Sequence, residues 1–371
     1  YVLVDTVGGN LQNEVYAFRG EWMHRSGNLL YSLGGSYKAV HEYRTFDPRP
    51  RNISSDFNAG GSLGIVFEEG CLIGHASYRR YNQDQSVTFV SNKGANTTLF
   101  HATGLGRDYW RFRSTGVFAA TRYAGQGFSA SAVGSVMHGR LVGGVSYEWL
   151  SVTRYLSNQN DAPLTTLATG TLEAFTSWRP SGNAALEARL TFESRDGREN
   201  VIDCAASGFY LDLLSMDMYS RDRLSASLSG AVEFYCGYGT WQVLPSTGFT
   251  SLSESYVYPS SSVRYRAWDG TLAAVFSTER GRWLYRTGAS AGYCLFPQSS
   301  SSLQCMDSRI LQAYADKYAF QSSDFAHASL QLMAQRELDG RMAIFSTLSA
   351  SGTLRDRQTA CCMSLSIGIS Y

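Results

Sequence analysis

The chain has 371 residues, of which 44% are hydrophobic and 13% aromatic, and its formal net charge is +1. This composition excludes an intrinsically disordered chain, and the near-neutral charge gives no overall field for holding nucleic acid. The longest apolar runs are only a few residues, so the sequence predicts no transmembrane helix. Glycine (36) and tyrosine (23) are abundant whereas proline (7) is scarce, which favours long, closely packed strands.

Alternation of apolar and polar residues predicts strands along the whole chain, because successive strand side chains point to opposite faces. In Ala184–Arg195, for example, Leu186 and Leu190 share one face while Glu187 and Arg189 share the other. Each segment is longer than the ~5–6 residues typical of soluble strands and suits a tilted membrane strand. In chain order, the predicted strands include Tyr1–Thr6, Leu141–Arg154, Ala184–Arg195, Leu224–Tyr238, Ala326–Glu337 and Ala360–Tyr371.

Two kinds of connection separate the strands. Short polar links, mostly containing glycine, are predicted at Arg25–Asn28, Glu69–Gly70, His138–Arg140, Pro180–Asn183, Glu279–Arg282 and Glu337–Gly340. Longer links are predicted at Phe46–Asp56, Asn82–Asn96, Ser157–Pro163, Asp196–Asn200, Leu244–Ser262 and Pro297–Asp324. A helical period appears in Ser308–Phe320, which predicts a short helix inside the last long link.

The final segment, Ala360–Tyr371, has an apolar face that ends on an aromatic residue and an opposite face of small and polar residues. It resembles the closing strand of a Gram-negative outer-membrane β-barrel. In that family such a strand is the signal read by the barrel-assembly machinery, and here the signal residues are Leu365, Ile367, Ile369 and Tyr371.

The resemblance implies one all-β domain over residues 1–371, a closed antiparallel transmembrane β-barrel in the bacterial outer membrane. Counting segments predicts roughly 14 to 18 strands, with 18 the preferred number, joined by short periplasmic turns and long extracellular loops. Outer-membrane lipids, lipopolysaccharide and the assembly machinery are the expected partners, and nucleic acid is not. Aromatic residues at strand ends are expected to form interfacial girdles: Trp22, Tyr109, Trp110, Trp149, Trp178, Trp241, Trp268, Trp283 and Tyr371.

Charged residues on the polar faces are expected to line the lumen, since on a lipid face each would cost roughly 2–4 kcal/mol at the midplane. They form either a hydrated pore with a slightly basic constriction or a ladder of paired Glu and Arg that rigidifies the barrel. The predicted lumen residues are Arg79, Arg111, Arg113, Glu148, Arg154, Glu173, Arg179, Glu187, Arg189, Glu193, Arg195, Arg282, Arg286 and Gln335.

Cysteine usage gives a mixed signal, because seven residues is an odd number and no CxxC pair is present. Cys294 and Cys305 flank a polar stretch and are a candidate disulfide, with two unbridged small side chains as the alternative. The six histidines are scattered, so neither a metal site nor a cofactor is predicted.

The segment Gly60–Gly64 matches the GxSxG pattern of serine hydrolases, with Ser62 in the nucleophile position. That motif requires a strand–turn–helix, whereas Ser62 is expected in the middle of a strand. The histidines cannot be joined to an acid or a serine by spacing alone. No catalytic residue is therefore predicted, and the chain is not expected to be an enzyme.

A porin-like channel for small solutes is the first functional hypothesis. The second is an accessory or binding barrel in a larger outer-membrane complex, such as TonB-dependent nutrient uptake, with protein partners bound through the extracellular loops. The translocator domain of an autotransporter is the third. The opening YVLVDTVGGN lacks an initiator Met and a hydrophobic leader, so either a mature chain or a missing N-terminal part is expected.

Overall fold

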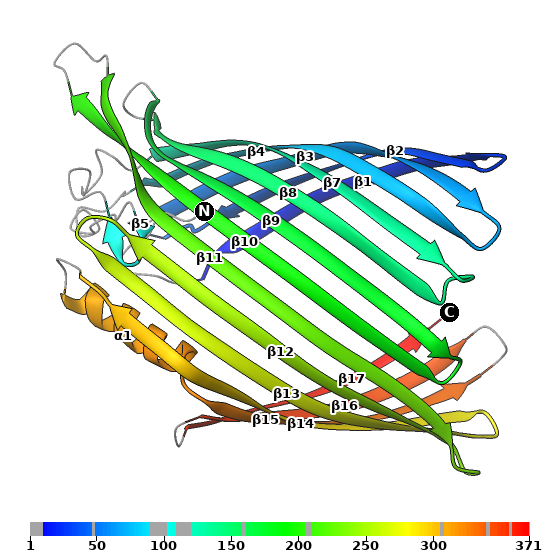
Figure 1. Ribbon diagram of the computed structural model, residues 1–371. Helices are drawn as coiled ribbons and strands as arrows, with labels where there is room; N and C mark the ends of the chain where they lie inside the picture. The colour runs from blue at the N-terminus through cyan, green and yellow to red at the C-terminus, as the bar shows by residue number, and fades with distance from the viewer. Residues whose placement is uncertain are drawn as a thin grey trace.

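The computed structural model describes residues 10–46, 49–88, 102–108, 120–157, 161–204, 210–304, 308–338, 342–355 and 358–370. One antiparallel sheet of 15 strands contains almost all of them, and its strand order follows the chain order (Figure 1). The prediction of an all-β antiparallel fold is therefore confirmed. The strands of this sheet are β1 Gln12–Ser26, β2 Leu29–Tyr43, β3 Arg49–Phe67, β4 Gly70–Thr88, β7 Ala120–Val136, β8 Leu141–Leu156, β9 Ala162–Ser181, β10 Ala184–Cys204, β11 Tyr210–Tyr235, β12 Thr240–Tyr256, β13 Ser261–Arg280, β14 Trp283–Ser302, β15 Phe325–Glu337, β16 Ala343–Arg355 and β17 Gln358–Ser370.

Two small elements lie outside the main sheet. A hairpin of β5 (Ala102–Gly104) and β6 (Arg107–Asp108) follows β4, and the helix α1 (Ser308–Gln321) follows β14. The helix predicted over Ser308–Phe320 is thus confirmed to within one residue. Among the described residues, no helix has the length and apolar character needed to cross a membrane.

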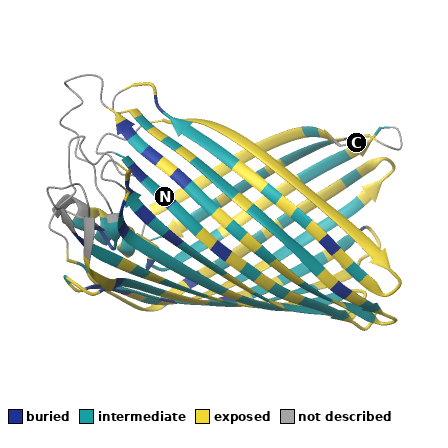
Figure 2. Ribbon diagram, turned by 90° about the horizontal axis from the view of Figure 1, so that it is seen from above, coloured by how far each residue is buried: buried dark blue, intermediate teal, exposed yellow. Residues whose placement is uncertain are grey.

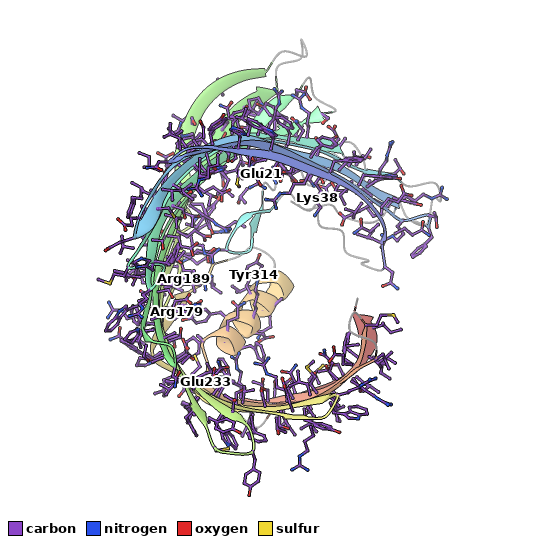
Figure 3. All side chains as sticks on the ribbon, turned by 90° about the vertical axis from the view of Figure 1, so that its right-hand side faces the viewer. Glu21, Lys38, Arg179, Arg189, Glu233 and Tyr314 are labelled. Carbon is purple, nitrogen blue, oxygen red and sulfur yellow. The ribbon has the colours of Figure 1, made fainter. Side chains whose placement is uncertain are left out.

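The sheet curls around so that its two outer strands, β1 and β17, approach each other, and α1 lies within the curve (Figures 1 and 3). No pairing between β1 and β17 is present among the described residues. The 15 strands fall within the predicted range but below the preferred number of 18, and the first predicted strand, Tyr1–Thr6, lies outside the described residues.

The period-two pattern produces a convex face that is apolar and a concave face that is polar. On β10 the convex residues Leu186, Leu190 and Phe192 are 43%, 45% and 41% exposed, which is unusual for large hydrophobic side chains. Exposed and less exposed residues alternate along most strands (Figure 2). Unbroken register over long stretches carries this alternation from strand to strand, because a slip of one residue would exchange the two faces.

One end of the sheet, here called the turn end, is closed by the predicted short links. Gly27 and Gly281 lie in two of these turns with φ of 59° and 62°, a conformation that glycine adopts without steric cost. The turn between β11 and β12 was not predicted: the strand expected to reach Tyr238 ends at Tyr235.

At the opposite end, here called the loop end, the sequence placed several loops where the chain is extended. Leu244–Ser262 is mostly strand, because β12 continues to Tyr256 and β13 begins at Ser261, and Asp196–Asn200 lies inside β10. Phe46–Asp56 likewise contains the first residues of β3. These stretches are rich in Ser, Asp and Asn, which are typical of loops. Strands that extend beyond the apolar part of the convex face need no apolar side chains, so the polar composition of these stretches did not indicate that they are strands.

Candidate functional site: the concave face and its loop-end mouth

Most of the predicted lumen residues share the concave face of the sheet. Figure 3 shows Glu21, Lys38, Arg179, Arg189 and Glu233 directed to the inside of the curve, together with Tyr314 of α1. Strand register places the following on that face: Arg79, Glu148, Arg154, Glu173, Glu187, Arg189, Glu193, Arg195, Arg286 and Gln335.

Three predicted residues do not fit this group. Arg282 lies in the turn between β13 and β14, where its guanidinium donates to the Leu338 carbonyl at 2.9 Å, so it caps the turn end and does not line the wall. Its position next to Gly281 explains the error, because the turn interrupts the alternation there. Arg111 and Arg113 lie outside the described residues.

Arg79 is the centre of the first ionic cluster. It forms two hydrogen bonds with Asp56, at 2.9 and 2.7 Å, and a third with Glu148 at 3.1 Å. Lys38 faces Asp56 across the β2–β3 ladder, and these residues border a cavity of about 310 Å³. Asp56 was missed as a wall residue because it was placed at the end of a predicted loop.

A second ionic cluster covers β9, β10 and β11. Arg189 lies 3.4 Å from both Glu173 and Glu187. Farther along β10, the Glu193 carboxylate lies 3.1 Å from the Arg195 guanidinium and 3.8 Å from that of Arg221 on β11. We call the two clusters together the charged wall, and every acid in it has a basic neighbour.

The opposite part of the concave face, here called the neutral wall, carries mainly hydroxyl groups on β14 to β17. Ser290 and Ser329 are hydrogen bonded at 2.8 Å, and Ser349 and Ser364 at 2.7 Å. Its described ionisable groups lie near its ends, such as Arg286 towards the turn end and Arg355 at the loop end. The middle of this wall therefore offers short, uncharged hydrogen-bonding groups.

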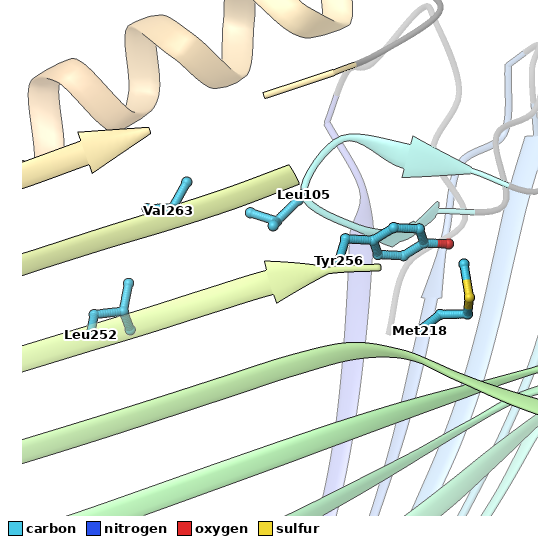
Figure 4. Packing of buried hydrophobic residues seen from close by; sticks show 5 residues of the cluster. All are labelled: Leu105, Met218, Leu252, Tyr256 and Val263. Atoms are coloured by element: carbon cyan, nitrogen blue, oxygen red, sulfur yellow. The ribbon is translucent and has the colours of Figure 1, made fainter. Parts of the chain in front are cut away.

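The loop-end mouth contains a hydrophobic cluster that joins the β5–β6 hairpin to the wall. Leu105, in the hairpin turn, packs with Met218, Leu252, Tyr256 and Val263, all at most 9% exposed (Figure 4). Leu303, just after β14, and Tyr318 of α1 pack against the same cluster, and the Tyr318 hydroxyl donates to the Arg264 carbonyl at 3.0 Å. The hairpin and the helix are therefore packed into the mouth.

The far end of α1 is fixed by Arg355 of β16. Its guanidinium lies 4.2 Å from the centre of the Phe320 ring and 4.5 Å from that of Phe325. It also donates to the Phe320 carbonyl, near the helix C-terminus, where a cation is favourable. Arg355 thus links the helix to the neutral wall.

A small cavity of about 240 Å³ lies next to the hairpin, and its mixed lining includes the apolar residues Val152 and Leu167 together with Thr103, Arg154 and Glu199. Tyr256 donates a hydrogen bond to Glu199 and is 3.1 Å from the Thr103 hydroxyl. The sequence does not point to Glu199, because the composition of Asp196–Asn200 predicts a loop where β10 continues.

The structure also brings together two residues that spacing could not connect. Ser62 Oγ lies 3.0 Å from His75 Nδ1, across the β3–β4 ladder. Both residues sit in the middle of strands, so their backbone N–H groups belong to ladders and offer no oxyanion hole. The pair is a cross-strand hydrogen bond and lacks the strand–turn–helix that GxSxG requires.

The predicted Cys294–Cys305 disulfide is wrong for this structure, in which Cys294 is a buried free thiol. Cys305 lies outside the described residues. Within the described ranges no group of His, Cys, Asp and Glu is arranged to hold a metal ion.

Aromatic residues of the convex face form two belts. Near the turn end, Trp22 lies 5.6 Å from Tyr31, Trp241 lies 5.0 Å from Phe276, and Arg336 covers the Trp283 ring at 5.5 Å. Trp178 belongs to the same belt.

Towards the loop end, Phe249 lies 4.6 Å from Trp268 and Phe128 lies 5.5 Å from Trp149. Convex residues between the belts are apolar and exposed, such as Leu272 (58%) and Leu332 (40%). The predicted girdle residues Tyr109, Trp110 and Tyr371 lie outside the described residues.

The final strand has the predicted facing. Leu365, Ile367 and Ile369 are 64%, 73% and 55% exposed on the convex side, whereas Ser364 and Ser366 face the neutral wall. The apolar outside, the polar inside and the two belts confirm the resemblance to an outer-membrane β-barrel at the level of fold.

Comparison with known proteins gives a family but no curated relative. A family model described as "Family of unknown function (DUF6850)" matches residues 1–371, and no curated protein matches the sequence. The β domain of the Bordetella autotransporter Brka is similar at 13% identity and a TM-score of 0.31, over 68% of this chain and 91% of that one. A bacterial polysaccharide outer membrane secretin has 10% identity and a TM-score of 0.32, over 85% and 90%. The copper transporter OprC has 8% identity and a TM-score of 0.45, over 97% of this chain and 65% of that one.

Proposed function

This chain belongs to the family of unknown function DUF6850, and we propose that it is an outer-membrane β-barrel that forms a porin-like channel for small solutes. One observation carries the proposal: large apolar residues are exposed on the convex face between two aromatic belts, whereas ion pairs and hydroxyl groups lie on the concave face. That inversion suits a wall with lipid outside and water inside.

In this proposal the turn end faces the periplasm and the loop end faces the exterior. Short turns join strands at the turn end, while α1 and the β5–β6 hairpin belong to links at the loop end. This asymmetry is typical of bacterial outer-membrane barrels.

Barrel closure is a further part of the proposal. Because the sheet has an odd number of consecutive antiparallel strands, β1 and β17 run parallel to each other. An antiparallel closure therefore needs one additional strand between them, giving an even number. Tyr1–Thr6, which the sequence predicts to be extended, lies outside the described residues.

Solutes in such a channel would pass between the charged wall and the neutral wall. The charged wall presents Arg and carboxylate groups in pairs. Its selectivity between anions and cations therefore depends on which member of each pair a solute meets first. The narrow part is expected at the mouth, where Leu105 and Tyr318 belong to one packed cluster.

Planar-bilayer recording tests the channel directly. The refolded full chain is expected to give discrete, steady single-channel steps. A variant with Leu105→Asp, which places a charge in the mouth cluster, should give larger or noisier steps. A matched control is Leu33→Ala, a 66%-exposed convex residue of β2 that should leave the conductance unchanged. A correctly folded barrel that never conducts, with or without the Leu105 substitution, contradicts the channel proposal.

An accessory barrel within a larger outer-membrane complex is the second candidate. The observation that favours it is the packing of two separate links, α1 and the β5–β6 hairpin, into the mouth, which narrows the path for solutes. Gentle extraction from native membranes separates the candidates: an accessory barrel co-purifies with a stoichiometric protein partner bound at the loop end, whereas a channel does not need one.

A further inference from the structure

A group of basic and polar residues lies on the convex face immediately beyond the loop-end aromatic belt. On β13, Arg266 has Ser251 as its neighbour on β12 and Gln298 as its neighbour on β14. The adjacent belt residue on the same strand is Trp268. Arg264, two residues farther from the belt, lies between Ser253 and Ser300. The two arginines and their serine and glutamine neighbours, but not Trp268, border a cavity of about 650 Å³.

Both guanidinium groups are directed away from the concave side. Arg264 and Arg266 are exposed, whereas the alternating residues Val263 and Ala267 are 6% and 7% exposed. Among the described residues neither arginine has an ionic partner. Other arginines do have one: Arg122 lies 3.1 Å from Asp161, and Arg198 lies 2.9 Å from Asp217. The positive charge of this pair is therefore available to an external anion.

The same chemistry recurs on another part of the convex face. Tyr78, Phe128 and Trp149 form a row of the aromatic belt on β4, β7 and β8. The next row towards the loop end is made of Arg80, Gln126 and Ser151. One arginine, one glutamine and one serine thus follow the aromatic belt at both places.

The spacing along β13 places Arg266 at a membrane interface. Between Arg266 and Arg280 the convex residues are uncharged, and they include Trp268, Leu272 and Phe276. At ~3.4 Å per residue and a tilt of ~45°, this stretch spans about 34 Å, close to the ~30 Å hydrocarbon thickness of a bilayer. Arg266 and Arg280 therefore lie at opposite interfaces of the proposed membrane.

We propose that Arg264 and Arg266, with Ser251, Ser253 and Gln298, bind the phosphate groups of a phosphorylated glycolipid in the outer leaflet. Guanidinium groups bind phosphate through paired, charge-assisted hydrogen bonds, and the neighbouring hydroxyl and amide groups suit sugar or phosphate oxygens. Two arginines spaced by two strand residues, about 7 Å apart, can engage two phosphates or both sides of one. This inference rests on the proposed outer-membrane location.

Native mass spectrometry of the detergent-purified full chain tests the site with bisphosphorylated lipid A as the probe. We expect the wild type to retain lipid A and R264Q/R266Q to bind it at least about ten-fold more weakly, the equivalent of one lost charge-assisted contact. The matched control is R280Q, on the same strand and face but at the other interface, which should bind like the wild type. Dephosphorylated lipid A should bind the wild type as weakly as the double variant binds the intact lipid.

The proposal is overturned if R264Q/R266Q retains lipid A like the wild type, or if dephosphorylated lipid A binds equally well. Competition by millimolar inorganic phosphate would identify a simple anion site and would also overturn the glycolipid assignment. Heat-modifiable gel migration reports folding of each variant, and conductance is recorded on the same preparations. A conducting barrel that ignores lipid A refutes only this inference, whereas a silent barrel that binds lipid A refutes only the channel.

Discussion

The charged wall and the neutral wall belong to one continuous sheet but use different chemistry on the concave face. In the charged wall, Arg79 and Arg189 each contact two carboxylates at 2.7 to 3.4 Å. In the neutral wall, hydroxyl pairs such as Ser349 and Ser364 take the corresponding positions. Between the aromatic belts the convex face is apolar over both.

The difference shows that the fold depends on alternation and not on which polar group fills the inner positions. Long ionic side chains reach across strands and are held by their partners, whereas short hydroxyl groups leave space. That space is occupied at the loop end by α1, which Arg355 fixes to the neutral wall. The inner chemistry is therefore free to determine what the barrel does.

The largest expected effect comes from comparing a charge placed on the convex face of β17 with one placed on its concave face. Ile367→Arg should impair membrane assembly, because a lipid-facing Arg costs roughly 2–4 kcal/mol at the midplane and less towards the interface, where Ile367 follows the row of Trp283 and Ile369. Ser366→Arg should assemble nearly normally, since residue 366 is on the concave face, where water can hydrate the charge. Heat-modifiable gel migration of outer-membrane fractions measures both variants, and equal outcomes would refute the assignment of faces.

A smaller effect is expected when one cation is removed from the charged wall. Arg189→Gln leaves Glu173 and Glu187 without their shared neighbour, so the lumen becomes more negative. One unit charge ~10 Å from a passing ion in water is worth about 0.4 kcal/mol, which raises the cation-to-anion permeability ratio about two- to four-fold. Reversal potentials in a salt gradient measure this ratio.

The neutral wall provides the control for that selectivity experiment. Ser290→Gln changes a hydroxyl group to an amide of no charge and should leave the permeability ratio unchanged. A comparable shift in both variants would mean that the two walls do not differ in their electrostatic influence on permeating ions.

A local effect of about ten-fold is expected on release of α1 from the neutral wall. Arg355→Gln removes the cation–π contacts with Phe320 and Phe325, which should weaken docking by about 1–2 kcal/mol. Hydrogen exchange of the Ser308–Gln321 amides should then be about ten-fold faster. Arg286→Gln, towards the other end of the same wall, should leave exchange in α1 unchanged, and unchanged exchange in Arg355→Gln would show that Arg355 does not fix the helix.

The smallest effect is expected for the outer partner of the Arg79 cluster. Glu148 is 54% exposed as a side chain, and Arg79 keeps its closer contact with Asp56 at 2.7 Å. Glu148→Gln should therefore change the free energy of unfolding by less than about 1 kcal/mol, whereas Asp56→Asn should destabilise more. Urea unfolding in detergent micelles compares the two.

Sequence alone predicted many of the wall residues where the strand assignment was right, although Glu233, in the predicted strand Leu224–Tyr238, was not among them. The ionic partners of Arg189 were all predicted as lumen residues, because Glu173, Glu187 and Arg189 lie in clearly alternating segments. Asp56 and Glu199 were missed because composition suggests loops there, and Arg221 because it precedes the predicted strand Leu224–Tyr238. Strands that extend beyond an apolar band lose the hydrophobic signal that makes them visible.

The alternation of apolar and polar residues by itself determined an all-β sheet with an apolar and a polar face. Turn residues such as Gly27 and Gly281 determined the short turns, and a helical period determined a helix within one residue of α1. All of these follow from local sequence. Only the tertiary structure decided which charges meet, that α1 and the β5–β6 hairpin pack into the mouth, and that Arg264 and Arg266 stand beyond an aromatic belt. These features depend on register between strands and on contacts between distant segments, such as Leu105 with Val263, and no local pattern encodes them.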